Sequence, residues 1–120
     1  MIQTFLTIAF LLLPTQTTAN SLPKEPLSIE QKITQELGEE FINIARCESG
    51  LRQFNDQGTV LISPTSDKGL FQINQVHWSE AKKRGIDLDT VDGNIAFAKI
   101  LKEEGGTQPW FMSKNCWSKK

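Results

Sequence analysis

Residues 44–78 contain the stretch on which the fold depends, and they read IARCESGLRQFNDQGTVLISPTSDKGLFQINQVHW. A carboxylate, Glu48, stands at the end of an apolar periodic run, and Gly50 follows as a helix stop. A polar segment then leads to a second carboxylate, Asp67, just before the run Gly69-Leu70-Phe71-Gln72-Ile73-Asn74. The surroundings of these two acids decide what chemistry they can perform.

The residues before Glu48 predict a helix that carries this acid on its buried face. Ser28-Ile29-Glu30-Gln31 has the pattern of a capping box, in which Gln31 reaches back to the cap. Glu48 lies on the apolar stripe that follows at spacings of three and four, formed by Ile29, Ile33, Leu37, Phe41, Ile44 and Ala45. Gly38 costs about 1 kcal/mol inside a helix, so the pattern also fits two helices that meet there.

Two short apolar runs predict a small β element. Thr59-Val60-Leu61-Ile62 lies between Gly58 and Pro64, and residues 69–73 form the second run. With a turn at residues 64–67, they predict an antiparallel ribbon. Two strands alone are marginally stable, so we expect the ribbon to lean on the helices.

Three further helices are predicted after the ribbon. Residues 77–84 form a short one that ends at Gly85, and residues 89–104 form a longer one capped by Asp89 or Thr90. The longer one has an apolar face of Val91, Ile95, Ala98 and Leu101. Pro109 can begin a last short helix, with the apolar groups Trp110, Phe111, Cys116 and Trp117. The chain is therefore predicted to form a mostly helical α+β domain over residues 28–120.

The first 27 residues predict an exported protein. Residues 1–19 have no charged side chain and are apolar from Phe5 to Leu13, which is short of the about 20 residues that span a bilayer. They fit a signal peptide with small residues at Thr17-Thr18-Ala19, the predicted cleavage site. An uncleaved anchor is the alternative, because the segment lacks Lys and Arg. Residues 20–27 contain two prolines and predict a linker.

Charge and cysteine content narrow the function classes. The net charge of −1, without a dense basic patch, argues against nucleic-acid binding. Two cysteines and one histidine are too few for an ordinary zinc site, and we expect neither a metal nor another cofactor. In an exported chain, Cys47 and Cys116 suggest a disulfide; two unpaired thiols are the alternative.

The two acids have the surroundings that glycosidic bond cleavage requires. That reaction needs a carboxylic acid to protonate the leaving oxygen and usually a second, ionised carboxylate. The apolar stripe favours the protonated form of Glu48, whereas Asp67 stands among Ser, Thr and Lys. Two alternatives stay open at this point. Asp67 can be a turn residue, and Glu48 can form a buried ion pair with Arg46, Arg52 or a lysine.

Four motifs in order resemble the lysozyme superfamily. Ala45-Arg46-Cys47-Glu48-Ser49-Gly50 and the Gly-Leu-Phe-Gln-Ile run, with Ser63 before it, are similar to soluble lytic transglycosylases. The fuller run of residues 65–74, with Trp78 after it, is more similar to C-type lysozymes. The other two motifs resemble that family's third helix and C-terminal segment: Asp89-Thr90-Val91 with Asn94, and Pro109-Trp110 followed by Asn115-Cys116. The resemblance covers about residues 40–117.

The resemblance implies a lysozyme-like fold, with the β element beside a cleft that binds peptidoglycan, and a monomeric enzyme. Glu48 would be the general acid, and Asp67 the nucleophile or charge stabiliser. The substrate-binding residues would be Gln72 and Asn74 in the cleft, His77 and Trp78 at its rim, and Trp110 near Glu48. The residues alone leave other roles open: core packing for Trp110, surface exposure for His77 and a backbone hydrogen bond for Gln72.

Asp67 separates the two reactions that the resemblance implies. Both cleave the β-1,4 bond between N-acetylmuramic acid and N-acetylglucosamine. If Asp67 faces Glu48, water completes a hydrolysis; if it points away, the muramyl 6-hydroxyl attacks and gives a 1,6-anhydro product. A non-catalytic glycan-binding module is the third alternative. The chain departs from C-type lysozymes in four ways: it has at most one disulfide, its helix cysteine comes a turn later, His77 replaces a tryptophan, and the segment between the two acids differs in length.

Overall fold

The computed structural model describes Thr4 and residues 24–119. The helices and strands, which run from Ile29 to Trp117, form a mostly helical α+β unit. The predicted signal peptide, apart from Thr4, and residues 20–23 of the predicted linker lie outside the described residues. The elements are α1 (Ile29–Leu37), α2 (Glu40–Ser49), β1 (Asp67–Lys68), β2 (Ile73–Asn74), η1 (Gln75–His77), α3 (Trp78–Lys83), α4 (Val91–Gly105), η2 (Gln108–Ser113) and α5 (Lys114–Trp117), where η1 and η2 are 3-10 helices. The coarse part of the predicted fold class, a mostly helical α+β domain with a small antiparallel β element, is confirmed.

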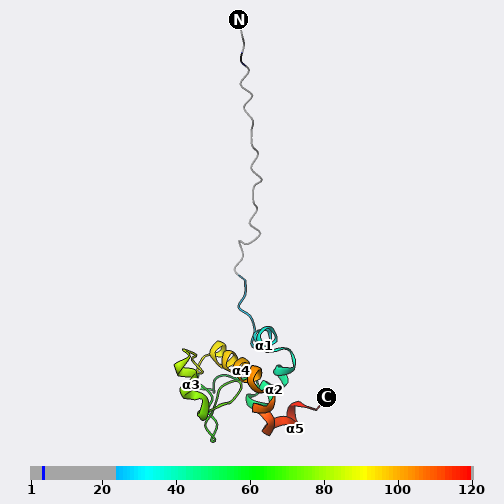
Figure 1. Ribbon diagram of the computed structural model, residues 1–120, viewed down its shortest axis with the longest axis vertical. Coiled ribbons are helices and arrows are strands. Elements are labelled where there is room, and N and C mark those ends of the chain that lie inside the picture. The colour runs from blue at the N-terminus through cyan, green and yellow to red at the C-terminus, as the bar shows by residue number, and fades with distance from the viewer. Residues whose placement is uncertain (1–3, 5–23, 120) are drawn as a thin grey trace.

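The apolar stripe before Glu48 forms two helices. The capping box of α1 is present, with Ser28 and Gln31 bonded to each other's backbone N–H. The helix ends at Gly38, which has a φ of 99°, and α2 then runs to Gly50, which adopts the left-handed conformation. The two helices α1 and α2 are thus separate elements (Figure 1). Glu48 lies in the last turn of α2.

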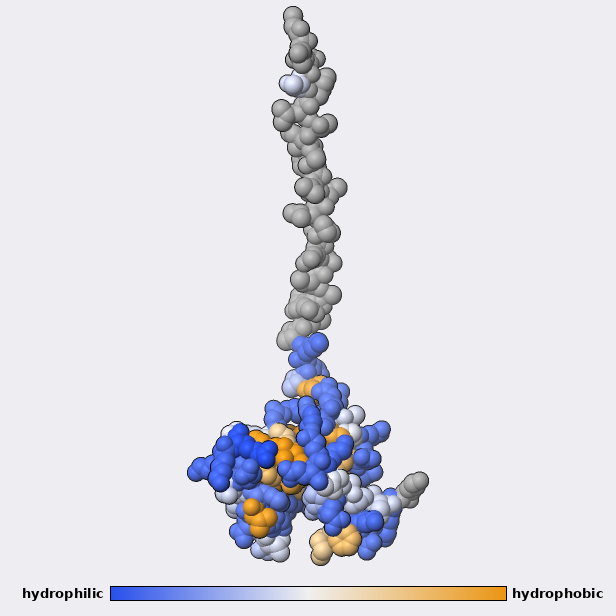
Figure 2. All heavy atoms as spheres, in the orientation of Figure 1, coloured by the Kyte–Doolittle hydropathy of each residue, from blue (hydrophilic) through white to orange (hydrophobic). Residues whose placement is uncertain are grey.

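The hydrophobic core lies where α1, α2 and α4 meet the turn between the two strands. α4 runs across the middle of the fold beside α1 (Figure 1). The fully buried large apolar side chains are Phe41, Phe71, Phe97, Ile33, Leu37, Ile44, Leu70, Ile73 and Ile95. Polar residues cover most of the face in Figure 2, and hydrophobic residues reach that face in separate groups.

An antiparallel β element is present, but its strands are not the predicted ones. β1 pairs with β2 in antiparallel fashion, with Asp67 opposite Asn74. In the first predicted strand, Val60 and Ile62 form only isolated bridges. Most of the second, residues 69–72, is a turn closed by a 3.0 Å bond from Gln72 N to Gly69 O. The predicted turn at residues 64–67 is present one residue earlier, closed by a bond from Ser66 N to Ser63 O.

Two buried amides, Gln53 and Asn94, explain why residues 69–72 turn. Leu70 N donates to Gln53 Oε1 and Phe71 N donates to Asn94 Oδ1, each at 2.8 Å. These side chains take the place of a strand partner for the backbone. Gly69, with a φ of 73°, fits between them: a Cβ there would lie 2.4 Å from Asn94 Nδ2.

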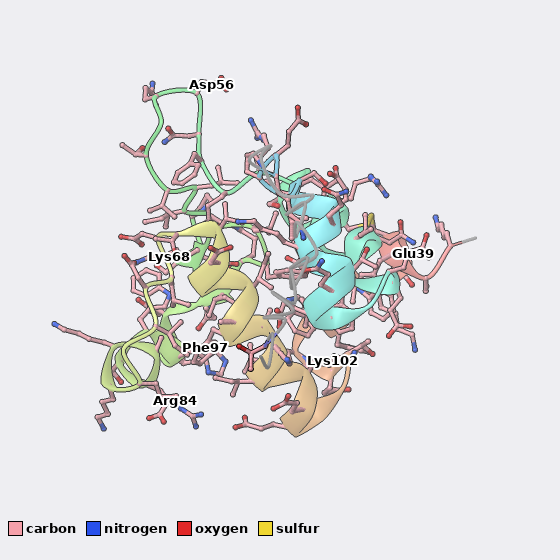
Figure 3. The ribbon with its side chains drawn as sticks, turned by 90° about the horizontal axis from the view of Figure 1, so that it is seen from above. Glu39, Asp56, Lys68, Arg84, Phe97 and Lys102 are labelled. Atoms are coloured by element: carbon pink, nitrogen blue, oxygen red, sulfur yellow. A yellow bond between two sulfur atoms is a disulfide. The ribbon has the colours of Figure 1, made fainter. Side chains whose placement is uncertain are left out.

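The remaining helices follow the prediction closely. α3 ends before Gly85, and Thr90 rather than Asp89 caps α4 by accepting a bond from Gly93 N. The C-terminal helix begins as the 3-10 helix η2, and α5 is a single turn. Figure 3 shows the loop around Asp56 projecting away from the helices. Within the described part of the chain, no helix has the length and apolar content that crossing a membrane requires.

The predicted disulfide between Cys47 and Cys116 is present and joins α2 to α5. The alternative of unpaired thiols is therefore wrong. The bond links residues 69 positions apart, so it constrains most of the domain in the unfolded chain.

Candidate active site

A cleft of about 400 Å³ brings both predicted acids together. Its walls come from the end of α2, the strand pair, η1 and η2. It also contains four of the five residues predicted to bind substrate: Gln72, Asn74, His77 and Trp110. Thr65, Ile73, Leu101, Pro109 and Met112 complete the lining.

The end of α2 is held against the turn that follows β1. Ser49 is buried, and its Oγ lies 2.7 Å from the carbonyl oxygen of Leu70. This bond joins two parts of the stretch of residues 44–78, namely the segment around Glu48 and the run Gly69–Asn74. This contact places Glu48 beside the strand that carries Asp67.

Glu48 is half-buried, and its carboxyl group is disposed to hold a proton. Burial raises its pKa above the ordinary value, a hydrogen bond from Ser113 lowers it, and the charge of Asp67 raises it again. Among residues 24–119 no ion pair with a lysine or an arginine includes Glu48. Arg52 pairs with Asp56, and Arg46 donates to Asn43. The ion-pair alternative for Glu48 is therefore wrong.

Asp67 is disposed to stay ionised. Burial alone would raise its pKa, but three hydrogen bonds outweigh burial and hold the pKa below the ordinary value. Ser63 donates to Oδ2 at 2.9 Å, Thr65 donates to the same oxygen, and Asn74 Nδ2 donates to Oδ1 at 2.8 Å. Asp67 also closes a turn, since its N–H donates to Ser63 Oγ. The turn role and the cleft position are thus compatible.

The pKa values of the two acids shift in opposite directions within one cleft. The shifts widen the pH range over which a protonated Glu48 stands beside an ionised Asp67. Such a pair can donate a proton to a leaving group and stabilise positive charge in one reaction.

Trp110 forms the floor of the cleft and also belongs to the core. It is 3% exposed, and its ring meets Phe41 and Phe71 at centroid distances of 5.4 and 5.8 Å. Its indole Nε1 donates to Phe71 O at 3.0 Å. Both readings of Trp110 therefore apply: core residue and cleft lining.

The two remaining polar residues occupy the strand side of the cleft. Gln72 has a φ of 51°, and its Nε2 donates to Gly69 O at 2.9 Å, so the expected backbone hydrogen bond is present. His77 is half-buried, with its ring 5.6 Å from that of Phe97. Both side chains line the cleft.

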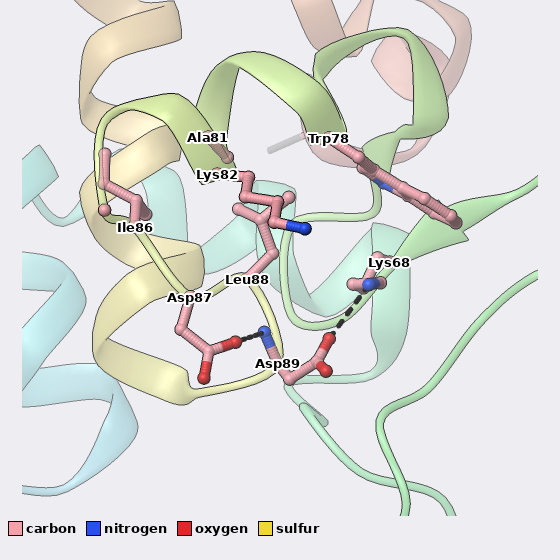
Figure 4. A pocket seen from close by; sticks show the side chains of 9 residues that line it. Lys68, Trp78, Ala81, Lys82, Ile86, Asp87, Leu88 and Asp89 are labelled. Atoms are coloured by element: carbon pink, nitrogen blue, oxygen red, sulfur yellow. Dashed lines mark hydrogen bonds and ion pairs between the residues drawn. The ribbon is translucent and has the colours of Figure 1, made fainter.

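Trp78 does not line this cleft, contrary to the prediction. It lines a second hollow of about 420 Å³ with Lys68 and Asp89 (Figure 4). Its Nε1 donates to Ile73 O at 2.9 Å, and Lys68 Nζ lies 4.3 Å from the ring centroid. These contacts hold the indole ring at the second hollow.

Sequence reasoning missed two residues that line the cleft, Thr65 and Met112, and one residue outside the lining, Ser113, that contacts Glu48. Ser113 touches Glu48 from η2, and Thr65 donates to Asp67. Ser113 carries no recognisable sequence signal, because it approaches Glu48 only through the tertiary fold. In the part of the chain described here, no group of three or more histidine, cysteine or carboxylate side chains is placed to hold a metal ion.

Searches against protein families, curated proteins and solved structures returned no match. The function is therefore argued from the cleft itself.

Proposed function

We propose that this protein is a peptidoglycan-cleaving glycosidase of lysozyme-like fold. It acts on the β-1,4 bond between N-acetylmuramic acid and N-acetylglucosamine. The observation that carries the proposal is the opposite pKa shift of Glu48 and Asp67 in one cleft. The family resemblance of the surrounding motifs supplies the substrate class.

Glu48 begins the reaction as a general acid. Its proton passes to the glycosidic oxygen as the bond to the anomeric carbon breaks, and positive charge develops at that carbon. Asp67 stabilises this charge as a carboxylate. Glu48, now ionised, accepts a proton from the attacking water, and the product is a reducing sugar end.

The lining of the cleft suits a sugar chain. Pyranose rings present polar edges and apolar faces, and binding sites for them need hydrogen-bonding groups beside apolar surface. Gln72, Asn74 and His77 supply the polar groups, and Trp110 and Leu101 supply apolar surface. Met112, 93% exposed on η2, extends the apolar surface toward solvent.

A second candidate is a lytic transglycosylase. The observation that favours it is the occupancy of both Asp67 oxygens by hydrogen bonds, which makes this carboxylate a weak nucleophile. The muramyl 6-hydroxyl would then attack the anomeric carbon, and Glu48 would act first as acid and then as base.

Mass spectrometry of digested peptidoglycan separates the candidates. Hydrolysis adds one water to each cleaved bond, whereas the transglycosylase leaves 1,6-anhydro ends. Binding of the glycan without any product would indicate a non-catalytic module and would contradict both enzymatic candidates.

The disulfide supports export as part of the proposal. Disulfides persist in oxidising compartments and are rare in the cytosol. We therefore propose that the protein reaches the periplasm, the cell-wall space or the exterior and meets peptidoglycan there as a monomer.

A further inference from the structure

Ser113 stands at the end of η2, opposite the carboxyl group of Glu48. Its Oγ lies 2.5 Å from Glu48 Oε1 and 3.2 Å from the carbonyl oxygen of Trp110. A serine hydroxyl has one proton to donate and two lone pairs that accept. Ser113 can therefore donate fully to only one of these oxygens at a time.

We propose that Ser113 is a positioning residue for Glu48. The Ser113 hydroxyl turns between Glu48 Oε1 and Trp110 O as Glu48 gains or loses its proton. When Glu48 is ionised, Ser113 donates to Oε1. When Glu48 is protonated, it donates to Ser113 Oγ, and Ser113 donates to Trp110 O. No proton is transferred through Ser113, because the proton of Glu48 exchanges with sugar or water.

The second acceptor, Trp110 O, is fixed in place. The buried ring of Trp110 is anchored by its bond to Phe71 O. Trp117 Nε1 donates to Trp110 O at 3.2 Å, which leaves the second lone pair of this oxygen for Ser113. Trp110 O is thus an acceptor whose position does not depend on the state of Glu48.

The disulfide holds the two partners of the Ser113–Glu48 contact together. Cys47 immediately precedes Glu48, and Cys116 lies three residues after Ser113. The covalent bond ties α2 to α5 next to this contact, so Ser113 cannot drift away when the charge of Glu48 changes.

Other ionisable groups do not replace Ser113 at Glu48. Asp67 from β1 and His77 from η1 line the cleft with it. η2 carries no ionisable side chain, and Lys114 of α5 is exposed and outside the cleft lining. The ionisable side chains of α1 also lie outside the cleft lining: Glu30, Lys32 and Glu36. Removing the Ser113 hydroxyl therefore alters the titration of Glu48 without removing a charge.

The role of Ser113 rests on the proposed function, in which Glu48 alternates between acid and base. A partner that bonds both forms keeps the carboxyl group in one orientation through the cycle. Such preorganisation contributes to catalysis because the catalytic group need not be repositioned between steps.

The test is an NMR titration of the Glu48 carboxyl carbon in ¹³C-labelled protein, with Glu48→Gln used to identify its resonance. Ser113→Ala removes a donor that favours the ionised form, so the Glu48 midpoint shifts to higher pH. Ser113→Thr keeps a hydroxyl and returns the midpoint toward wild type. Ser118→Ala is the matched control, because Ser118 donates to Lys114 O in the same terminal segment; it leaves the midpoint unchanged.

An unchanged midpoint in Ser113→Ala would overturn the inference. An equal shift in Ser113→Thr and Ser113→Ala would also overturn it. The titration does not depend on catalysis, so it separates this inference from the proposed function. If wild type cleaves no peptidoglycan and the midpoint still moves as described, the proposed function fails, whereas the coupling between the Ser113 hydroxyl and the titration of Glu48 stands.

Discussion

Asp67 and Asn74 face each other as register partners in the strand pair, and Asn74 Nδ2 donates to Asp67 Oδ1 at 2.8 Å. The backbone pairing and the side-chain bond reinforce each other. Antiparallel pairing brings opposite side chains within reach, so the small sheet orients an acid of the cleft. Asn74 also caps η1 through a bond from Val76 N to its Oδ1. One residue thus links the Asp67 carboxylate to the element that carries His77.

Loss of the Asn74 amide should raise the pKa of Asp67. Asn74→Ala removes a donor to the carboxylate, so the acidic limb of the pH–rate profile should move to higher pH. Asn74→Asp keeps an acceptor for the η1 cap but adds a like charge, so the limb should move further. An acidic limb that stays in place in both variants would show that Asp67 does not govern it.

The pH dependence of activity should be bell-shaped. Asp67 must be ionised, and its lowered pKa places the loss of activity at a pH below the ordinary range of an aspartate. Glu48 must be protonated, and its raised pKa extends activity to higher pH before the alkaline loss. Measurement of kcat/KM against pH checks both limbs. A single limb would contradict the assignment of two opposed carboxyl groups.

The raised pKa of Glu48 should also make the free energy of unfolding depend on pH. Because the folded-state pKa is raised, the protonated carboxyl favours the fold below the unfolded pKa, and this contribution is lost as pH rises through the folded pKa. Glu48→Gln should therefore become more stable relative to wild type as pH rises, in urea unfolding at a series of pH values. Glu103→Gln, on the exposed side of α4, controls for removal of a carboxylate as such.

Gly69 should tolerate no side chain. Gly69→Ala forces a φ of 73° on an L-residue and brings Cβ to 2.4 Å from Asn94 Nδ2, so the cost should be about 3 kcal/mol or more. Gly58→Ala is the matched control, with a φ of 79° and no atom within 4 Å; it should cost about 1 kcal/mol. If chemical denaturation showed that Gly69→Ala and Gly58→Ala lose the same free energy of unfolding, the close fit at Gly69 would be contradicted.

Reduction of the Cys47–Cys116 bond should destabilise the domain by about 2–4 kcal/mol. Cys116 is exposed, so reductant can reach the bond. A domain of this size should then unfold about 10 °C lower or more in a thermal melt. The Cys47→Ala, Cys116→Ala double variant should melt at the reduced temperature with or without reductant. If reductant lowered the melting temperature of that variant too, the lower melting temperature of the reduced wild type could not be attributed to the disulfide.

Local signals predicted the helical part of the fold. The Ser28–Gln31 capping box and the helix break at Gly38 depend on neighbouring residues, and both are present. The position of Glu48 near the end of α2 follows from the same periodicity. Such features are visible in sequence because their partners lie within one or two turns.

Contacts between distant residues escaped prediction. Residues 69–72 have the composition of a strand, but Gln53 and Asn94 bind their backbone from 17 and 23 residues away and turn the chain. Trp78 was expected at the cleft, but its bond to Ile73 O fixes its ring elsewhere. The Ser113–Glu48 contact spans 65 residues and depends on how η2 crosses α2. Periodicity carries no information on these pairings.

The central claim, that Glu48 cleaves glycan strands as a general acid, is tested most directly by product release. Purified peptidoglycan would be incubated with wild type, Glu48→Gln and the control Asp56→Asn, whose side chain is 98% exposed on a distant loop. Soluble fragments would be quantified by mass spectrometry. The account predicts fragments from wild type and Asp56→Asn, and a loss of at least about 100-fold in Glu48→Gln. Undiminished release by a folded Glu48→Gln variant would contradict it.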